Sequence, residues 1–187
     1  MDFLAELWLP ILLSGVAVFV ISSVIHMVLP YHKSDFQTLP GEEKAMDVLR
    51  GLDIPPGDYY FPYVKSDEKM NSESYQTRVE QGPVGSLTIM AKGGPNMGNS
   101  LIQWFVYTLV VGIFAAYVAY NAIGPSDTYL EVFQFTGAVS FTGYALALAQ
   151  QSIWYHKKWS STLKSTFDGL IYALLTAGMF GWLWPGL

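Results

Sequence analysis

The stretch that decides the fold is LIQWFVYTLVVGIFAAYVAYNAI, residues 101–123. It contains no Asp, Glu, Lys or Arg, and about 20 predominantly apolar residues are enough for an α-helix to cross the hydrocarbon core of a bilayer. Three further runs of this kind lie outward from it, at residues 7–29, 130–154 and 167–184. The sequence therefore predicts an all-α integral membrane protein with four transmembrane helices.

The composition agrees with a membrane protein and excludes several functions. Only 13% of the residues are charged, compared with about 25% in an ordinary soluble domain. A net charge of −5 leaves no basic surface for nucleic acid. Because the chain has no cysteine, disulfides, thiolate metal sites, iron–sulfur clusters and thioether-linked haem are excluded.

The polar segment 30–99 separates the first transmembrane region, residues 1–29, from the region 100–187 that holds the other three helices. Its helical spacing of apolar residues predicts one short helix at 41–50. Residues 59–61 and 84–90 are rich in strand formers and could pair. We expect a small mixed α/β segment here. Gly124-Pro125 ends the second predicted helix, so a tight turn should lead into the third.

The positive charges predict the orientation. Of the ten Lys and Arg residues, seven lie within 30–99 and three lie between the third and fourth helices. Because cytoplasmic loops retain positive charge, we expect residues 30–99 on the cytoplasmic side of a bacterial inner membrane and both termini outside.

The three histidines are the candidate metal ligands. His26, His32 and His156 all fall at the predicted cytoplasmic ends of the helices. Imidazole binds transition metals and haem, and it needs a second hydrogen-bond acceptor to orient it. Three carboxylates could serve as that acceptor: Asp35, Glu42 and Asp168. The alternative is that these histidines lie at the interface without binding metal, and no cofactor is predicted as the leading interpretation.

The transmembrane runs otherwise contain no ionisable group near their middles, and Glu131 and Asp168 are expected at helix ends. Transporters and voltage sensors usually need buried ionisable groups, so their absence argues against those functions. Small residues allow close helix packing, either within this chain or against a partner protein. The candidate partner-contact residues are Gly112, Ala116, Gly137, Gly143, Trp182 and Trp184.

The stretch Leu29-Pro30-Tyr31-His32-Lys33-Ser34-Asp35, with the later Pro56-Gly57-x-Tyr59-x-Phe61-Pro62, resembles a group of small, uncharacterised bacterial membrane proteins with four spans. That resemblance implies a bacterial membrane location and no particular activity. Physically, Pro30 should break the first helix, Lys33 should reach the head groups and Asp35 should cap or pair.

The leading functional prediction is an accessory or scaffolding subunit of a larger inner-membrane complex, which contacts lipid and other membrane proteins through its helices and its cytoplasmic segment. The first alternative is a membrane-bound metal or haem enzyme that uses the three histidines. The second alternative is a small transporter.

Overall fold

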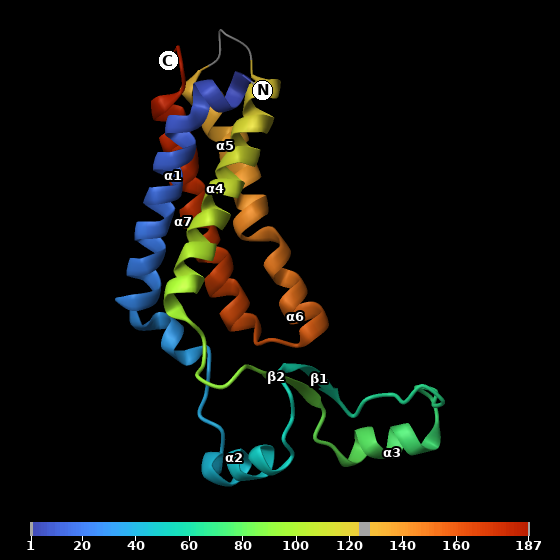
Figure 1. The fold of residues 1–187 in the computed structure, drawn as a ribbon. Coiled ribbons are helices and arrows are strands. Elements are labelled where there is room, and N and C mark those ends of the chain that lie inside the picture. Colours follow the sequence, from blue (N-terminus) through green and yellow to red (C-terminus); the bar gives the residue numbers. More distant parts are fainter. Residues whose placement is uncertain (1, 124–127, 187) are drawn as a thin grey trace. The chain divides into compact units, whose positions relative to one another are not determined.

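The computed structural model describes residues 2–123 and 128–186, and it divides into two compact units (Figure 1). The first, which we call the helical unit, comprises the residues up to Gln37 together with those from Met97 onward. The second, the small unit, comprises Thr38–Asn96. The expected turn at Gly124-Pro125 lies outside the described residues.

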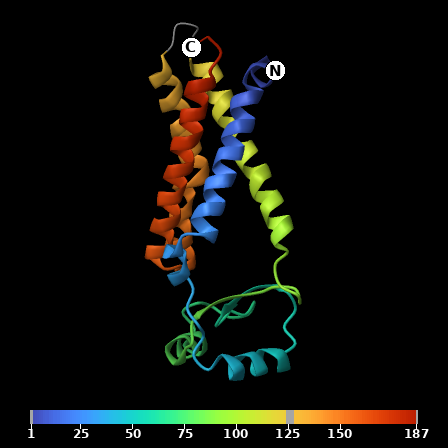
Figure 2. The same cartoon turned by 90° about the vertical axis from the view of Figure 1, so that its left-hand side faces the viewer.

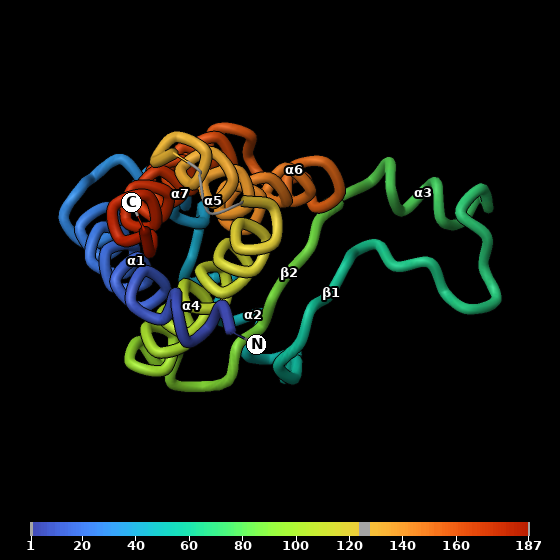
Figure 3. The backbone as a smooth tube through the Cα atoms, turned by 90° about the horizontal axis from the view of Figure 1, so that it is seen from above, coloured from blue at the N-terminus to red at the C-terminus, as the bar shows by residue number. Residues whose placement is uncertain are grey.

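The helical unit contains four helices long and apolar enough to cross a membrane, as the sequence predicts. They are α1 (Asp2–Met27), α4 (Met97–Ala122), a third made of α5 (Tyr129–Tyr144), the 3₁₀ turn η2 (Leu146–Leu148) and α6 (Ala149–Tyr155), and α7 (Trp159–Leu183). These helices pack in a ring, in which α1 contacts α4 and α7, and the α5 segment also contacts α4 and α7 (Figures 2 and 3).

Two helices differ from their predicted extents. The predicted helix 130–154 is interrupted by η2, next to a close contact with α7: a Cβ added to Gly169 would lie 2.7 Å from the Cβ of Ala145. The predicted helix 167–184 begins earlier, at Trp159. Its first turns are polar, with the sequence SSTLKST at 160–166, so hydropathy alone starts the helix too late.

Two clusters of buried side chains hold the ring together. One, near the end of the bundle that carries the N-terminus, contains Leu7, Val132 and Phe180. The other, toward the opposite end, contains Ile25, Val111, Tyr144, Tyr172 and Val18. The second cluster lies beneath the functional site described below, because Tyr172 also reaches His26.

In the small unit, β1 (Gly57–Phe61) and β2 (Gly85–Ile89) form an antiparallel pair in which Tyr59 lies opposite Leu87. The pairing predicted for 59–61 with 84–90 is confirmed. Helix α2 (Glu42–Gly51) matches the predicted helix 41–50 within one residue at each end. Helix α3 (Glu73–Gln81) was not predicted, since its sequence ESYQTRVEQ has no apolar periodicity.

Candidate metal centre

The site forms where the chain turns back at the end of α1. Helix α1 ends at Met27, and Pro30 opens the 3₁₀ turn η1 (Pro30–Ser34), where its fixed φ suits a first helical position. The turn carries Tyr31 and His32, followed by Asp35, back to α7, which supplies Lys164 and Asp168. We call these five side chains the polar cluster: Tyr31, His32, Asp35, Lys164 and Asp168.

His32 lies between two carboxylates. Its Nδ1 is 2.6 Å from Asp35 Oδ2, and its Nε2 is 2.7 Å from Asp168 Oδ2. Both bonds form together only when each ring nitrogen shares a proton with its carboxylate. Asp168 also accepts a hydrogen bond from the Tyr31 hydroxyl, and this carboxylate is only 2% exposed. A carboxyl this deeply buried requires such partners.

Lys164 completes the cluster from one helical turn before Asp168. Its Nζ donates to the Tyr31 carbonyl at 2.6 Å, to Ser34 Oγ at 2.8 Å and to Asp35 Oδ1 at 2.8 Å. The ammonium group therefore has three acceptors, which matches its three protons. The expected pairing of Asp35 is thus observed, and its partners are Lys164 and His32.

These contacts change the pKa values of Tyr31, in η1, and of Asp35, directly after it. Burial raises the pKa of Asp35, but the hydrogen bonds from Lys164 and His32 outweigh that effect and lower the pKa to about 2. Burial, followed by the hydrogen bond to Asp168, raises the pKa of Tyr31 well above its usual range. Asp35 is therefore an anion and Tyr31 a hydrogen-bond donor at neutral pH.

A second histidine lies beside the cluster. The ring of His26, in the last turn of α1, is centred 4.5 Å from the ring of His32, and its Nε2 is 3.4 Å from the Tyr172 hydroxyl. One ligand atom from each of His26, His32 and Asp168 lies within 4.8 Å of the others. His26 is exposed whereas Asp168 is buried, so the group opens on one side.

The donor set fits a transition metal ion. Two imidazoles and one carboxylate are the protein ligands of several catalytic zinc and non-haem iron sites. Metal-bound imidazoles usually donate their other ring N–H to a carboxylate, and Asp35 accepts from His32 Nδ1 in that way. His32 Nε2 and Asp168 Oδ2 would then exchange their mutual hydrogen bond for bonds to the ion.

The structure brings together two of the three predicted histidines. His156 caps the end of α6 with a left-handed backbone, is exposed, and does not belong to the group of His26, His32 and Asp168 among the described residues. Of the expected acceptors, Asp35 and Asp168 bond His32, whereas Glu42 lies in the small unit.

Asp168 corrects a further expectation. The sequence predicts it at the start of a helix, but α7 begins at Trp159, so Asp168 lies in the helix interior and is buried. Asp168 lies in the first half of α7 and bonds His32 of η1, so the expectation that no ionisable group lies near the middle of a transmembrane run stays a prediction. The argument against a transporter likewise stays a prediction.

The sequence reasoning also overlooked Tyr31 and Lys164 as members of the site. One signal was present: Lys164 and Asp168 are four residues apart, a spacing that puts two side chains on the same face of a helix. Hydropathy starts the fourth helix only at Phe167, which leaves Lys164 in a loop and hides this spacing. The contact between η1 and α7 joins distant parts of the chain, and no local pattern encodes it.

The small residues proposed as partner contacts pack within this chain. A Cβ on Gly112 would meet Ile11 of α1, one on Gly137 would meet Ala177 of α7, and one on Gly143 would meet Val111 of α4. Ala116 belongs to the buried cluster around Leu7, and Trp184 packs against that cluster. Trp182 is 75% exposed. A role of these residues toward a partner stays a prediction.

Comparison of this chain with protein-family models, with curated proteins and with solved structures gives no match. The resemblance to small bacterial membrane proteins stays a prediction, and the functional assignment relies on the geometry of the site.

Proposed function

We propose that this protein is a multi-pass membrane protein that binds a divalent transition metal ion through His26, His32 and Asp168. The observation that carries the proposal is the convergence of these three ligand atoms within 4.8 Å, with Asp35 already bonded to the outer nitrogen of His32. An isolated interfacial histidine would not need a carboxylate on each side.

Membrane insertion in this proposal is supported by the four long apolar helices and by the large apolar side chains that remain exposed along them, such as Val20, Val106 and Phe114. Exposed residues of this kind are stable against lipid. The distribution of Lys and Arg supports an orientation in a bacterial inner membrane in which the metal site lies on the cytoplasmic side.

Three protein ligands leave a coordination position free for water or a substrate, which is the arrangement of catalytic rather than structural zinc sites. A metal ion there would act as a Lewis acid. The chain's own residues hold the ligands: Asp35 orients His32, Lys164 fixes Asp35, and Tyr31 bonds the second oxygen of Asp168. The exposed His26 leaves an approach for the ion.

The test is metal analysis of the full chain purified in mild detergent, before and after incubation with zinc, manganese or cobalt. We expect about one equivalent of bound metal, and we expect H26Q, H32Q and D168N each to lower metal affinity about 10–100-fold. H156Q is the matched control, because His156 lies outside the group, and it should bind metal like the unmodified protein.

Cobalt adds a second readout, because its absorption spectrum reports the ligand set and should change in H26Q and H32Q but not in H156Q. Less than a tenth of an equivalent of every metal tested, or equal losses in H156Q and H32Q, would contradict the proposal. Helix content measured by circular dichroism separates loss of a ligand from loss of the fold.

A second candidate is the accessory-subunit function. It is supported by an open apolar groove of about 370 Å³ between α4 and α5, whose walls include Phe114, Val139 and Gly143. A groove on a lipid-facing surface suits the side of a partner helix. Purification from the native membrane should then recover a stoichiometric complex, and F114A, at an exposed side chain of the groove, should release the partner while leaving metal content unchanged.

A further inference from the structure

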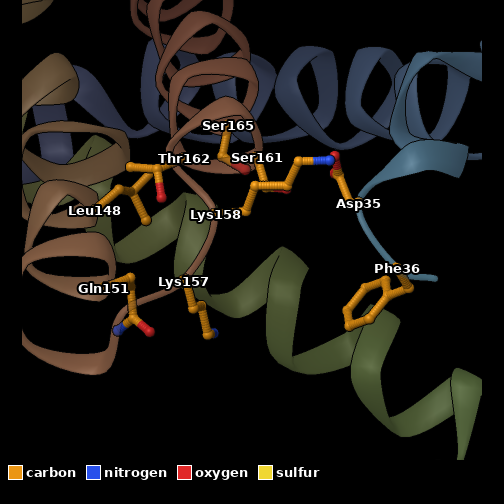
Figure 4. Close-up of a pocket in the computed structure, with 9 residues that line it drawn as sticks. All are labelled: Asp35, Phe36, Leu148, Gln151, Lys157, Lys158, Ser161, Thr162 and Ser165. Carbon is orange, nitrogen blue, oxygen red and sulfur yellow. The ribbon is translucent and has the colours of Figure 1, made fainter. Parts of the chain in front are cut away.

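A cavity of about 500 Å³ lies beside the polar cluster, between the α6–α7 connection and the residues that follow η1 (Figure 4). Lys157 and Lys158 come from that connection, and hydroxyl residues of the first turns of α7 form another side. Nine residues line it: Asp35, Phe36, Leu148, Gln151, Lys157, Lys158, Ser161, Thr162 and Ser165.

The charge of this cavity is positive. Asp35 is the one acidic group among its lining residues, and Lys164 and His32 already bond that carboxylate at 2.8 and 2.6 Å. Within the described part of the chain, Lys157 and Lys158 form no ion pair within 4.0 Å. The cavity is therefore lined by two ammonium groups without an ion pair to the described residues, and by one carboxylate that Lys164 and His32 already bond.

Polar groups without partners lie on the α7 side. The Ser161 hydroxyl contributes to the low pKa of Asp35, yet this buried oxygen makes no hydrogen bond of normal geometry with the described residues. Thr162, in contrast, is bonded to Ser152 at 2.7 Å. Lys158 precedes α7 as its N-cap residue and makes no side-chain cap bond, so the N–H groups of Trp159 and Ser160 in the first turn also remain available.

We infer that this cavity binds a phosphate group. Lysine ammonium groups, serine hydroxyls and the positive end of a helix each favour a phosphate oxygen, and here all three line one cavity. The cavity exceeds the size of a phosphate ion, and its apolar walls, Phe36 and Leu148, suit the organic part of a phosphate ester. The ester is either a phospholipid head group or a soluble metabolite.

The inference is independent of the proposed metal site, since none of His26, His32 and Asp168 lines the cavity. Asp35 is common to both regions: it bonds His32 beside the metal ligands, and it lines the cavity as a carboxylate that Lys164 pairs. Loss of metal binding would therefore leave the phosphate site intact, and the reverse also holds.

The test uses the full chain in detergent micelles. Native mass spectrometry measures retention of added phosphatidylglycerol and of phosphatidylcholine with the same acyl chains, and ³¹P line broadening measures binding of inorganic phosphate. We expect K157Q/K158Q to weaken binding at least tenfold. K33Q/K92Q changes the net charge equally at exposed lysines outside the cavity, and it should bind like the unmodified protein.

The outcomes distinguish the two sources. Preferential retention of phosphatidylglycerol that is lost in K157Q/K158Q supports a lipid head group, whereas phosphate binding with the same dependence and no preference between the lipids supports a soluble ester. K157R/K158R should restore binding in either case. Equal binding by the unmodified protein, K157Q/K158Q and K33Q/K92Q, or no binding of any probe, would overturn the inference.

Discussion

Lys164 is the residue on which the turn after α1 depends most. Its ammonium group bonds a backbone carbonyl, a hydroxyl and a carboxylate that all belong to the segment from Tyr31 to Asp35. No other lysine in the described part of the chain makes three such bonds between its side chain and another segment. The lysine therefore fastens η1 to α7, in addition to setting the charge of Asp35.

Replacing Lys164 with methionine should destabilise the protein by about 2 kcal/mol. The change leaves Asp35 without its cation, and the cost is below the 3–5 kcal/mol of a fully buried pair because both side chains remain partly exposed. Denaturant-induced unfolding in detergent measures the loss. Lys158 forms no ion pair with the described residues, so K158M should change stability by less than about 0.5 kcal/mol, on the order of an ordinary surface substitution.

His32 and Asp35 are examples of what a sequence can and cannot reveal about a site. The sequence predicted His26 and His32 as ligands and Asp35 and Asp168 as acceptors, because residue chemistry and the position of Pro30 were enough for that. It also grouped His156 with them, because all three histidines are predicted at one level of the bilayer. The sequence does not say on which side of the bundle each of them lies. Only the packing of α1 against α7 determines which histidines meet.

At Gly169, helix α7 packs closely against the end of α5. A Cβ on Gly169 would lie 2.7 Å from the Cβ of Ala145 and 3.1 Å from the carbonyl oxygen of Tyr144. The glycine directly follows Asp168, and Ala145 lies at the junction between α5 and η2. Close helix packing and the polar cluster are therefore coupled through adjacent residues.

G169A should lower the free energy of unfolding by about 1–3 kcal/mol, the usual cost of forcing a methyl group into a packed contact. G178A lies on the same helix, where an added Cβ has no neighbour within 4 Å. It should be neutral or stabilising by up to about 1 kcal/mol, because alanine favours the helix over glycine. Equal effects of the two changes in the same unfolding assay would contradict this packing.

The elements differ in how well their sequences encode them. Long apolar runs encode the four long helices, and alternating strand formers encode β1 and β2. Helix α3 depends instead on the Ser72 cap, which accepts a hydrogen bond from the Tyr75 amide, and on Glu68, which bonds Arg78. These contacts involve polar and charged side chains, so no periodic pattern of apolar residues predicts the helix.

Acid should loosen α3 through Glu68. The hydrogen bonds from Arg78 and Ser74 lower the pKa of Glu68 from 4.5 to about 2. A carboxylate with a depressed pKa contributes stability above its unfolded value, and this contribution is lost as the pH falls from about 4.5 to about 2. The protection factors of the Tyr75 and Gln76 amides, which correct for the intrinsic pH dependence of exchange, should fall across this range.

The E68Q variant should exchange faster than the unmodified protein at pH 6 and should show a weaker dependence on pH. E73Q changes an acidic residue of the same helix whose side chain takes no part in the Arg78 contact, and it should keep the original dependence. If E68Q and E73Q behave alike, the Glu68–Arg78 pair does not stabilise α3.

For the whole molecule, the absence of cysteine makes the proposed orientation directly testable. Single cysteines at Ser66, in the small unit, and at Pro185, after α7, are separated by three of the four long helices. An impermeant maleimide should label P185C in intact cells and S66C only after permeabilisation. Labelling of both from the same side would contradict four spans, and the opposite pattern would reverse the orientation.

The polar cluster also gives the molecule an order of assembly. Tyr31, His32 and Asp35 are synthesised long before Lys164 and Asp168, their partners in the last helix of the bundle. Before α7 is present, the early groups cannot make these bonds, and each polar group left unpaired in a buried position costs about 1–3 kcal/mol. A nascent chain that stops before α7 therefore lacks the hydrogen-bond partners that Lys164 and Asp168 provide to the turn after α1. Completion of α7 supplies them.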